Sequence, residues 1–120
     1  MNRISILIFV LPIVISANTF EESVLDCDAG NAEACYSAGK FHSSHAYKNN
    51  NYDSSIAAAK VSSYYKKACN LGYIKGCTAY AMSYASDTNK DPEKNARYYF
   101  QKACDGGDDT GCTMLKMMPQ

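Results

Sequence analysis

The six cysteines of this chain fall into three pairs, and the two members of each pair are eight residues apart. The pairs are Cys27 with Cys35, Cys69 with Cys77, and Cys104 with Cys112. Two residues eight apart on one continuous helix have Cα atoms about 12 Å apart, whereas a disulfide spans roughly 7 Å at most. If each pair is a disulfide, the chain must therefore turn between its two cysteines.

The cysteine pairs also mark an internal repeat. The segment KKACNLGYIKGCT around Cys69 returns as QKACDGGDDTGCT around Cys104, and LDCDAGNAEACY around Cys27 is a weaker third copy. In every copy a glycine follows the first cysteine by three residues, where a helix C-terminus favours a left-handed residue. These glycines are Gly30, Gly72 and Gly107. Repeats with a period of 35 to 42 residues are typical of solenoid arrays.

Apolar residues recur at helical spacing between the turns. One stripe consists of Ala57, Val61, Tyr64, Tyr65, Ala68 and Cys69, and another of Ala96, Tyr99, Phe100, Ala103 and Cys104. Asp91 followed by Pro92 has the pattern of a helix start. We therefore predict an all-α chain with six helices, near 19–29, 34–47, 54–70, 76–86, 92–104 and 110–117. Residues 48–53 and 87–90 are the expected loops.

The N-terminal residues have the pattern of a secretory signal peptide. Arg3 precedes an apolar run from Ile4 to Ile15, and small residues up to Ala17 offer a cleavage site. The run is short for a membrane span, although an N-terminal anchor is the alternative interpretation. We predict a signal peptide at 1–17 and a secreted or periplasmic repeat domain at 18–120.

The interpretation of the cysteines depends on whether the chain is exported. An even set of cysteines in an oxidising compartment is expected to pair, whereas the same set in the cytosol more often binds metal. Six cysteines allow 15 pairings, and local pairing is favoured because the same spacing occurs three times. We therefore predict disulfides Cys27–Cys35, Cys69–Cys77 and Cys104–Cys112, and no bound metal or cofactor.

The charge of the chain is balanced, with 12 Lys and Arg residues against 12 Asp and Glu residues. Nucleic-acid-binding proteins carry a clustered excess of basic residues. We therefore expect no nucleic-acid partner, and no stable membrane insertion after signal cleavage.

The pattern Ala-Cys-x-x-Gly-x-x-x-Gly-Cys resembles the Sel1-like repeat. It is carried by the run from Tyr64 to Gly72 with Gly76 and Cys77, and by Lys102 to Cys104 with Gly107, Gly111 and Cys112. More closely, the chain resembles the cysteine-rich Sel1-like proteins known as Helicobacter cysteine-rich proteins. The resemblance implies a TPR-like right-handed superhelix of helix pairs with one disulfide per repeat, here two full repeats flanked by half-repeats. It also implies a family description as penicillin-binding proteins with weak β-lactamase activity.

Candidate catalytic and metal-binding residues are few. Ser37 and Ser63 each begin a Ser-x-x-Lys match, but the Ser-Asp-Asn and Lys-Thr-Gly elements of serine β-lactamases are missing. No catalytic residue is therefore assigned. His42 and His45 are three residues apart without a third ligand at helical spacing, and packing is the favoured interpretation of His42.

Two further groups are candidates for contacts with partners. The methionines at 114, 117 and 118 could bind a soft metal, but an apolar helix face is favoured, and self-association through Met114, Leu115 and Met118 is expected. Most tyrosines lie on the helical stripes, which leaves Tyr52 and Tyr73 as loop residues that could contact a ligand.

Two functional hypotheses follow. The first is a binding module that takes a peptide, a cell-wall-derived ligand or a protein partner on the concave face of the array. The second is a weak β-lactamase, which the family resemblance alone implies.

Overall fold

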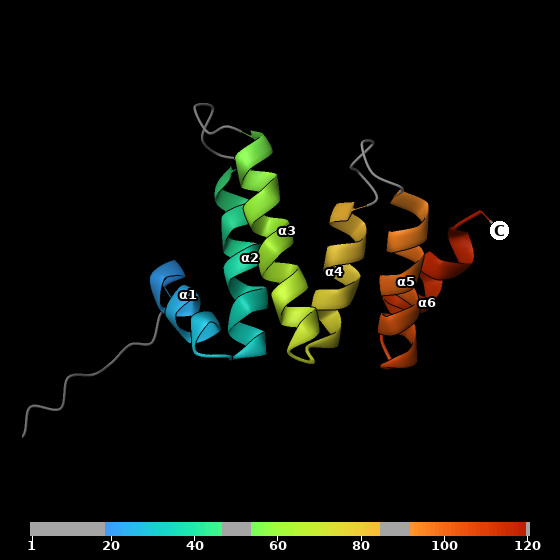
Figure 1. Ribbon diagram of the computed structural model, residues 1–120, viewed down its shortest axis with the longest axis horizontal. Coiled ribbons are helices and arrows are strands. Elements are labelled where there is room, and N and C mark those ends of the chain that lie inside the picture. The colour runs from blue at the N-terminus through green and yellow to red at the C-terminus, as the bar shows by residue number, and fades with distance from the viewer. Residues whose placement is uncertain (1–18, 47–53, 85–91, 120) are drawn as a thin grey trace, which may run out of the picture.

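A computed structural model of the protein describes residues 19–46, 54–84 and 92–119, and within these ranges it is all-helical (Figure 1). The helices are α1 (Phe20–Asp28), α2 (Ala32–Ala46), α3 (Ser54–Asn70), α4 (Ile74–Tyr84), α5 (Pro92–Asp105) and α6 (Asp109–Met117). The prediction of an all-α chain is confirmed. The predicted signal peptide, both predicted loops, Tyr52 and Asp91 lie outside the described residues.

The helices follow one another in a row, and each packs against the next in the chain (Figure 1). Thr19 caps the first of them, since its hydroxyl accepts a hydrogen bond from the backbone N–H of Glu22 at 3.3 Å. The fifth begins at Pro92, the position predicted from its fixed φ. None of the described helices has the length and apolar character needed to cross a membrane.

Three corners of the same design join α1 to α2, α3 to α4, and α5 to α6. The turns at residues 29–31, 71–73 and 106–108, together with the two helix ends that flank each turn, are called the first, second and third corners. In the second corner, the N–H of Gly72 donates to the carbonyl of Cys69 at 3.0 Å and that of Tyr73 donates to Ala68 at 2.9 Å. The same two bonds close the first and third corners, and they form the Schellman ending of a helix. The central glycines have φ of 94 to 97°, which L residues rarely adopt.

Each turn between two helices takes only three residues, so two of the helices start earlier than predicted. The second and fourth helices begin at Ala32 and Ile74, two residues before the predicted starts. In the first corner Asn31 serves as the cap, because its Oδ1 accepts a hydrogen bond from the N–H of Ala34 at 3.1 Å.

A disulfide crosses each corner, between the last turn of one helix and the first turn of the next. The bonded pairs are those that the spacing predicts, Cys27–Cys35, Cys69–Cys77 and Cys104–Cys112. Their Cα atoms are 4.5, 4.6 and 4.5 Å apart. The turn between the cysteines therefore brings them within the range of a disulfide.

The core is built from these disulfides and from small and aromatic residues of the following helix. The first disulfide packs against Ala68 and Tyr64 of α3, and the second packs against Ala103 and Tyr99 of α5. When the cysteine pairs are placed in register, Ala68 is equivalent to Ala103 and Tyr64 to Tyr99. Successive corners therefore pack on each other through equivalent positions.

Candidate functional site

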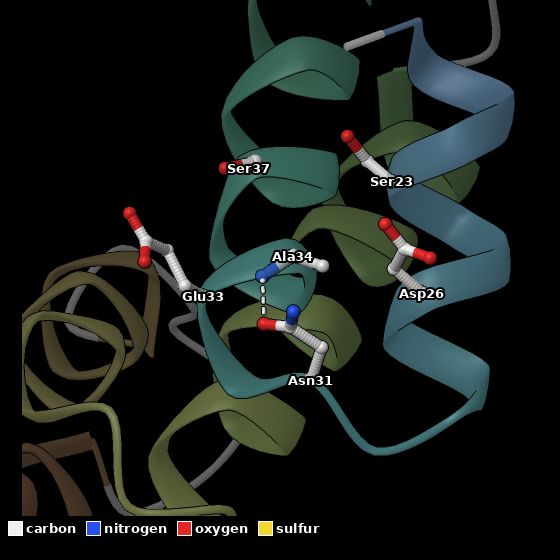
Figure 2. Close-up of a pocket in the computed structure, with 6 residues that line it drawn as sticks. All are labelled: Ser23, Asp26, Asn31, Glu33, Ala34 and Ser37. Carbon is white, nitrogen blue, oxygen red and sulfur yellow. Dashed lines mark hydrogen bonds between the residues drawn. The ribbon is translucent and has the colours of Figure 1, made fainter. Parts of the chain in front are cut away.

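A polar pocket of about 220 Å³ lies between α1 and α2. It is lined by Ser23, Asp26, Asn31, Glu33, Ala34 and Ser37 (Figure 2). Five of these six side chains are polar, and two of them are carboxylates. A site with this lining suits a hydroxyl or a cationic group such as an ammonium, which the carboxylates would stabilise.

Ser23 is the most enclosed polar group of the pocket. Its side chain is 6% exposed, and Figure 2 shows it projecting from α1 toward the pocket. An enclosed hydroxyl that faces a pocket can exchange a hydrogen bond with a ligand group or with water.

The sequence of the first corner explains why a pocket forms there. Tyr65 and Phe100 stand at the positions equivalent to Ser23, and Ala68 and Ala103 at those equivalent to Asp26. The residue before the second cysteine also differs, because it is alanine in the first corner and glycine, Gly76 or Gly111, in the others. The first corner thus has a serine where the other corners have a large aromatic residue, and a carboxylate where they have alanine.

The glycines of the other corners allow a close approach of the two helices. A Cβ on Gly76 would lie 2.8 Å from the Cβ of Ala68 and 2.9 Å from the backbone nitrogen of Cys69. A Cβ on Gly111 would lie 2.7 Å from that of Ala103. These distances leave no room for a methyl group. At the equivalent position of the first corner, Ala34 carries such a Cβ, and its side chain lines the pocket.

At the second corner, the positions equivalent to the pocket receive a side chain from the preceding helix. The ring of Tyr36 in α2 packs against Tyr65 and Tyr73, with centroids 5.6 and 5.2 Å apart. Burial of Tyr65 raises the pKa of its hydroxyl, and the neighbouring Tyr36 adds to this. Tyr73, which the sequence suggested as a free contact residue, therefore packs within the chain.

The third corner receives a side chain in the same way. Thr78 of α4, which is equivalent to Tyr36, donates a hydrogen bond to the carboxylate of Asp108, which is equivalent to Tyr73. We use the term socket for the residues of a corner that receive the preceding helix. The pocket is the socket of the first corner, and within the described ranges no helix precedes α1 to fill it.

Neither of the two predicted Ser-x-x-Lys matches brings its serine and its lysine together as a catalytic pair. Ser37 lines the pocket, while the Nζ of Lys40 lies 5.6 Å from the ring centroid of Tyr36 in a cation–π arrangement. Ser63 is exposed on α3, outside the pocket. The structure thus brings Ser37 to a pocket without showing its lysine beside it.

The histidines show no metal site in the part of the chain that is described. His42 stacks on Phe20, with ring centroids 5.6 Å apart and an interplanar angle of 13°. The side chain of His45 lies outside the described residues. Among the residues that the structure describes, no three His, Cys, Asp or Glu side chains are grouped to hold a metal ion.

The C-terminal residues that the sequence suggested for self-association pack largely on the chain itself. Met114, Leu115 and Met118 are half-buried against a cluster of Ala81, Ala96 and Phe100. Met117 points away from this cluster and is 73% exposed. The surface that the last helix offers to a partner is therefore narrower than the sequence suggests.

One further surface was missed by the sequence analysis. Lys40 in α2, Met82 in α4 and Met117 in α6 occupy equivalent positions, and all three are exposed. Met82 is 51% exposed and Met117 is 73% exposed. The register of the cysteine pairs, extended five residues beyond the second cysteine, could have revealed this row.

Comparison with known proteins adds no identification. No protein-family model matches the chain, and no curated protein and no solved structure matches it either. The resemblance to the Sel1-like repeat stays a prediction that rests on the motifs of the sequence.

Proposed function

We propose that this chain is an exported α/α solenoid of the Sel1-like type that serves as a binding module. Its ligand would be a peptide, a cell-wall-derived peptide or an extended segment of a protein partner. The solenoid arrangement is supported by the two inter-corner contacts that use equivalent residues, because repeated contacts of this kind generate a regular array. Export to the periplasm or the medium is supported by the signal pattern and by three disulfides, which persist in oxidising compartments.

The exposed row of Lys40, Met82 and Met117 is the observation that carries the proposal. In a regular array, equivalent positions of successive units lie along one side, and a ligand that spans the units would meet these side chains in turn. Methionine is flexible and polarisable and is common on surfaces that accept varied apolar side chains. Lys40 adds a cation at the end of the row nearest the pocket, where it can pair with a carboxylate of the ligand.

A peptide-display selection against the oxidised protein tests this proposal. Peptides that bind through the row should lose about tenfold or more in affinity for a Met82→Ser variant, as expected for a contact worth about 1.4 kcal/mol. Leu25→Ser is the matched control, because Leu25 is 69% exposed but lies on α1, outside the row. Selected peptides that bind both variants equally well, or a selection that yields no binder, would contradict the proposal.

Weak β-lactam hydrolysis is the alternative that the family resemblance implies. The only described feature in its favour is that Ser37 lines a pocket. Nitrocefin turnover by the oxidised protein, lost in Ser37→Ala, would support it. No turnover and no covalent label from a penicillin would leave the binding module as the function.

A further inference from the structure

The first and last of the described helices carry surfaces that complement each other. At the N-terminal end, the socket of the first corner forms an open polar pocket. At the C-terminal end, the disulfide Cys104–Cys112 is half-buried, whereas the cysteines of the other two bridges are at most 1% exposed. The first two bridges owe their burial to the helix that follows, and the third has no such helix within the described residues.

The last helix carries, on its exposed side, the positions that fill sockets elsewhere. Thr113 is equivalent to Tyr36 and Thr78, and it is exposed. Lys116 is equivalent to Gly39 and Ala81, and it is also exposed. In the preceding units these positions belong to the face that packs on the next corner.

We propose that a second copy of this chain docks head to tail, with its α6 on the first corner and with its Lys116 in the pocket. The proposal uses the array geometry of the proposed function but not its ligand. The neighbouring Thr113 of the second copy would then face Asn31. This is the arrangement that joins Thr78 to Asp108 inside the chain.

The sizes of the side chains support this docking. Within the chain, a small residue of the preceding helix faces a large aromatic residue of the next corner. Gly39 faces Tyr65 so closely that a Cβ on the glycine would lie 2.7 Å from the ring, and Ala81 packs with Phe100 in one cluster. At the two ends the sizes are reversed, since long Lys116 meets short Ser23 and the pocket beside it.

The charges that line the pocket also favour Lys116 of a second copy as its occupant. Asp26 and Glu33 both line the pocket. Figure 2 shows the Asp26 carboxylate and the enclosed Ser23 hydroxyl on the same face of α1, where a lysine ammonium would contact both. A charge-assisted contact of this kind favours a lysine over the aromatic side chains that fill the second socket. Because the two docking surfaces are different, the contact is heterologous and leaves a free end on each copy, so association continues into longer chains or a closed ring.

The test uses the oxidised protein purified after export, studied by sedimentation velocity at increasing concentration. Wild-type protein should form species larger than one copy. Asp26→Lys and Lys116→Glu should each weaken association by about tenfold or more, because each leaves like charges facing each other. The double variant with both changes restores an opposite pair and should associate again.

A mixture of the two single variants gives the sharpest result. Asp26→Lys keeps a normal α6 and Lys116→Glu keeps a normal pocket, so the two variants should associate with each other when mixed, although each associates only weakly alone. The remaining ends of such a pair carry Lys at position 26 and Glu at position 116, which also attract, so larger alternating species should form. Glu21→Lys is the matched control on an exposed part of α1 outside the pocket and should associate like the wild type. Ser23→Tyr restores the aromatic residue of the second corner and provides a second way to close the pocket if Asp26→Lys fails to fold.

Three outcomes would overturn the proposal: wild-type protein that stays a single copy at every concentration, association that both single variants retain, or a double variant that is not restored. Each variant is also measured for binding to a selected peptide. Because Met82 lies outside the pocket, loss of self-association with intact peptide binding separates this proposal from the proposed function, and the reverse result does so as well.

Discussion

The hydroxyl of Thr78 in α4 donates a hydrogen bond to the side-chain carboxylate of Asp108, which lies thirty residues further along, in the third corner. Thr78 is 6% exposed. Tyr36 and Tyr73 pack together at the equivalent positions one unit earlier. A polar pair in one unit and an aromatic pair in the other therefore join a helix to the next corner. The position therefore fixes how one corner stacks on the next, whatever the chemistry of the contact.

Replacing Thr78 with valine should destabilise the protein, because the substitution keeps the shape but removes the donor. We expect a loss of about 1.5 kcal/mol in the free energy of unfolding, at the lower end for a bond to a charged group since water reaches the half-buried Asp108. Urea unfolding of the oxidised protein measures this. Thr113→Val changes the equivalent but exposed position and should stay within about 0.5 kcal/mol of the wild type at low protein concentration. Equal losses in both variants would argue against a structural role of the bond.

Two glycines of the second corner should respond differently to alanine. Gly72 has a φ of 97°, but a Cβ there would meet no atom within 4 Å. Gly72→Ala should therefore cost about 1 to 2 kcal/mol from backbone conformation alone. Gly76→Ala forces a methyl group against Ala68 and against backbone, which cannot move aside, and should cost about 3 kcal/mol or fail to fold. The reverse order of the two losses, measured by urea unfolding, would refute this account of the close approach.

Much of the fold could be predicted from the sequence because its determinants are local. Eight-residue cysteine spacing and a glycine three residues after the first cysteine define each corner, and the structure has the three disulfides and the positive φ there. The helix starts at Ala32 and Ile74 were missed because the sequence does not show that three residues suffice for the turn.

The candidate site could be predicted much less well, because it depends on contacts between units. Tyr73 looked like a loop residue, but Tyr36 from another unit packs on it. The sequence does not mark Ser23 and Asp26 as site residues, since short polar residues on a helix ordinarily face solvent. Their place in a pocket becomes evident only from the structure, which shows the side chains that fill the equivalent sockets of the other corners.

The three disulfides should be reduced in a defined order. Thiolate attack on a disulfide requires access to a sulfur, and Cys104–Cys112 is half-buried, whereas the sulfurs of the first two bridges are enclosed. Under limiting dithiothreitol, Cys104 and Cys112 should be alkylated first, as followed by mass spectrometry of the digested protein. Loss of this bridge should then remove about 2.5 kcal/mol of stability by the chain-entropy estimate.

Unfolding in urea before reduction provides the control, because the three bridges enclose loops of equal length and should then react at similar rates. Reduction of Cys27–Cys35 first in the folded protein would show that burial does not set the order.

Alkaline pH should destabilise the protein through Tyr65. Burial, assisted by the neighbouring Tyr36, raises the pKa of Tyr65 above its ordinary value of 10.0. The folded state therefore holds this proton at a pH at which the unfolded chain releases it. This contribution to stability is complete below about pH 10 and is lost as the pH rises from there through the raised pKa.

Tyr65→Phe isolates this effect, because it keeps the ring that packs beside Gly39 and removes the titrating hydroxyl. The free energy of unfolding of the variant should fall less steeply above pH 10 than that of the wild type, when both are measured by urea unfolding under non-reducing conditions. Tyr98→Phe is the control, since Tyr98 is 61% exposed. Its profile should follow the wild type, and a Tyr65→Phe profile that also follows the wild type would show that Tyr65 does not couple pH to folding.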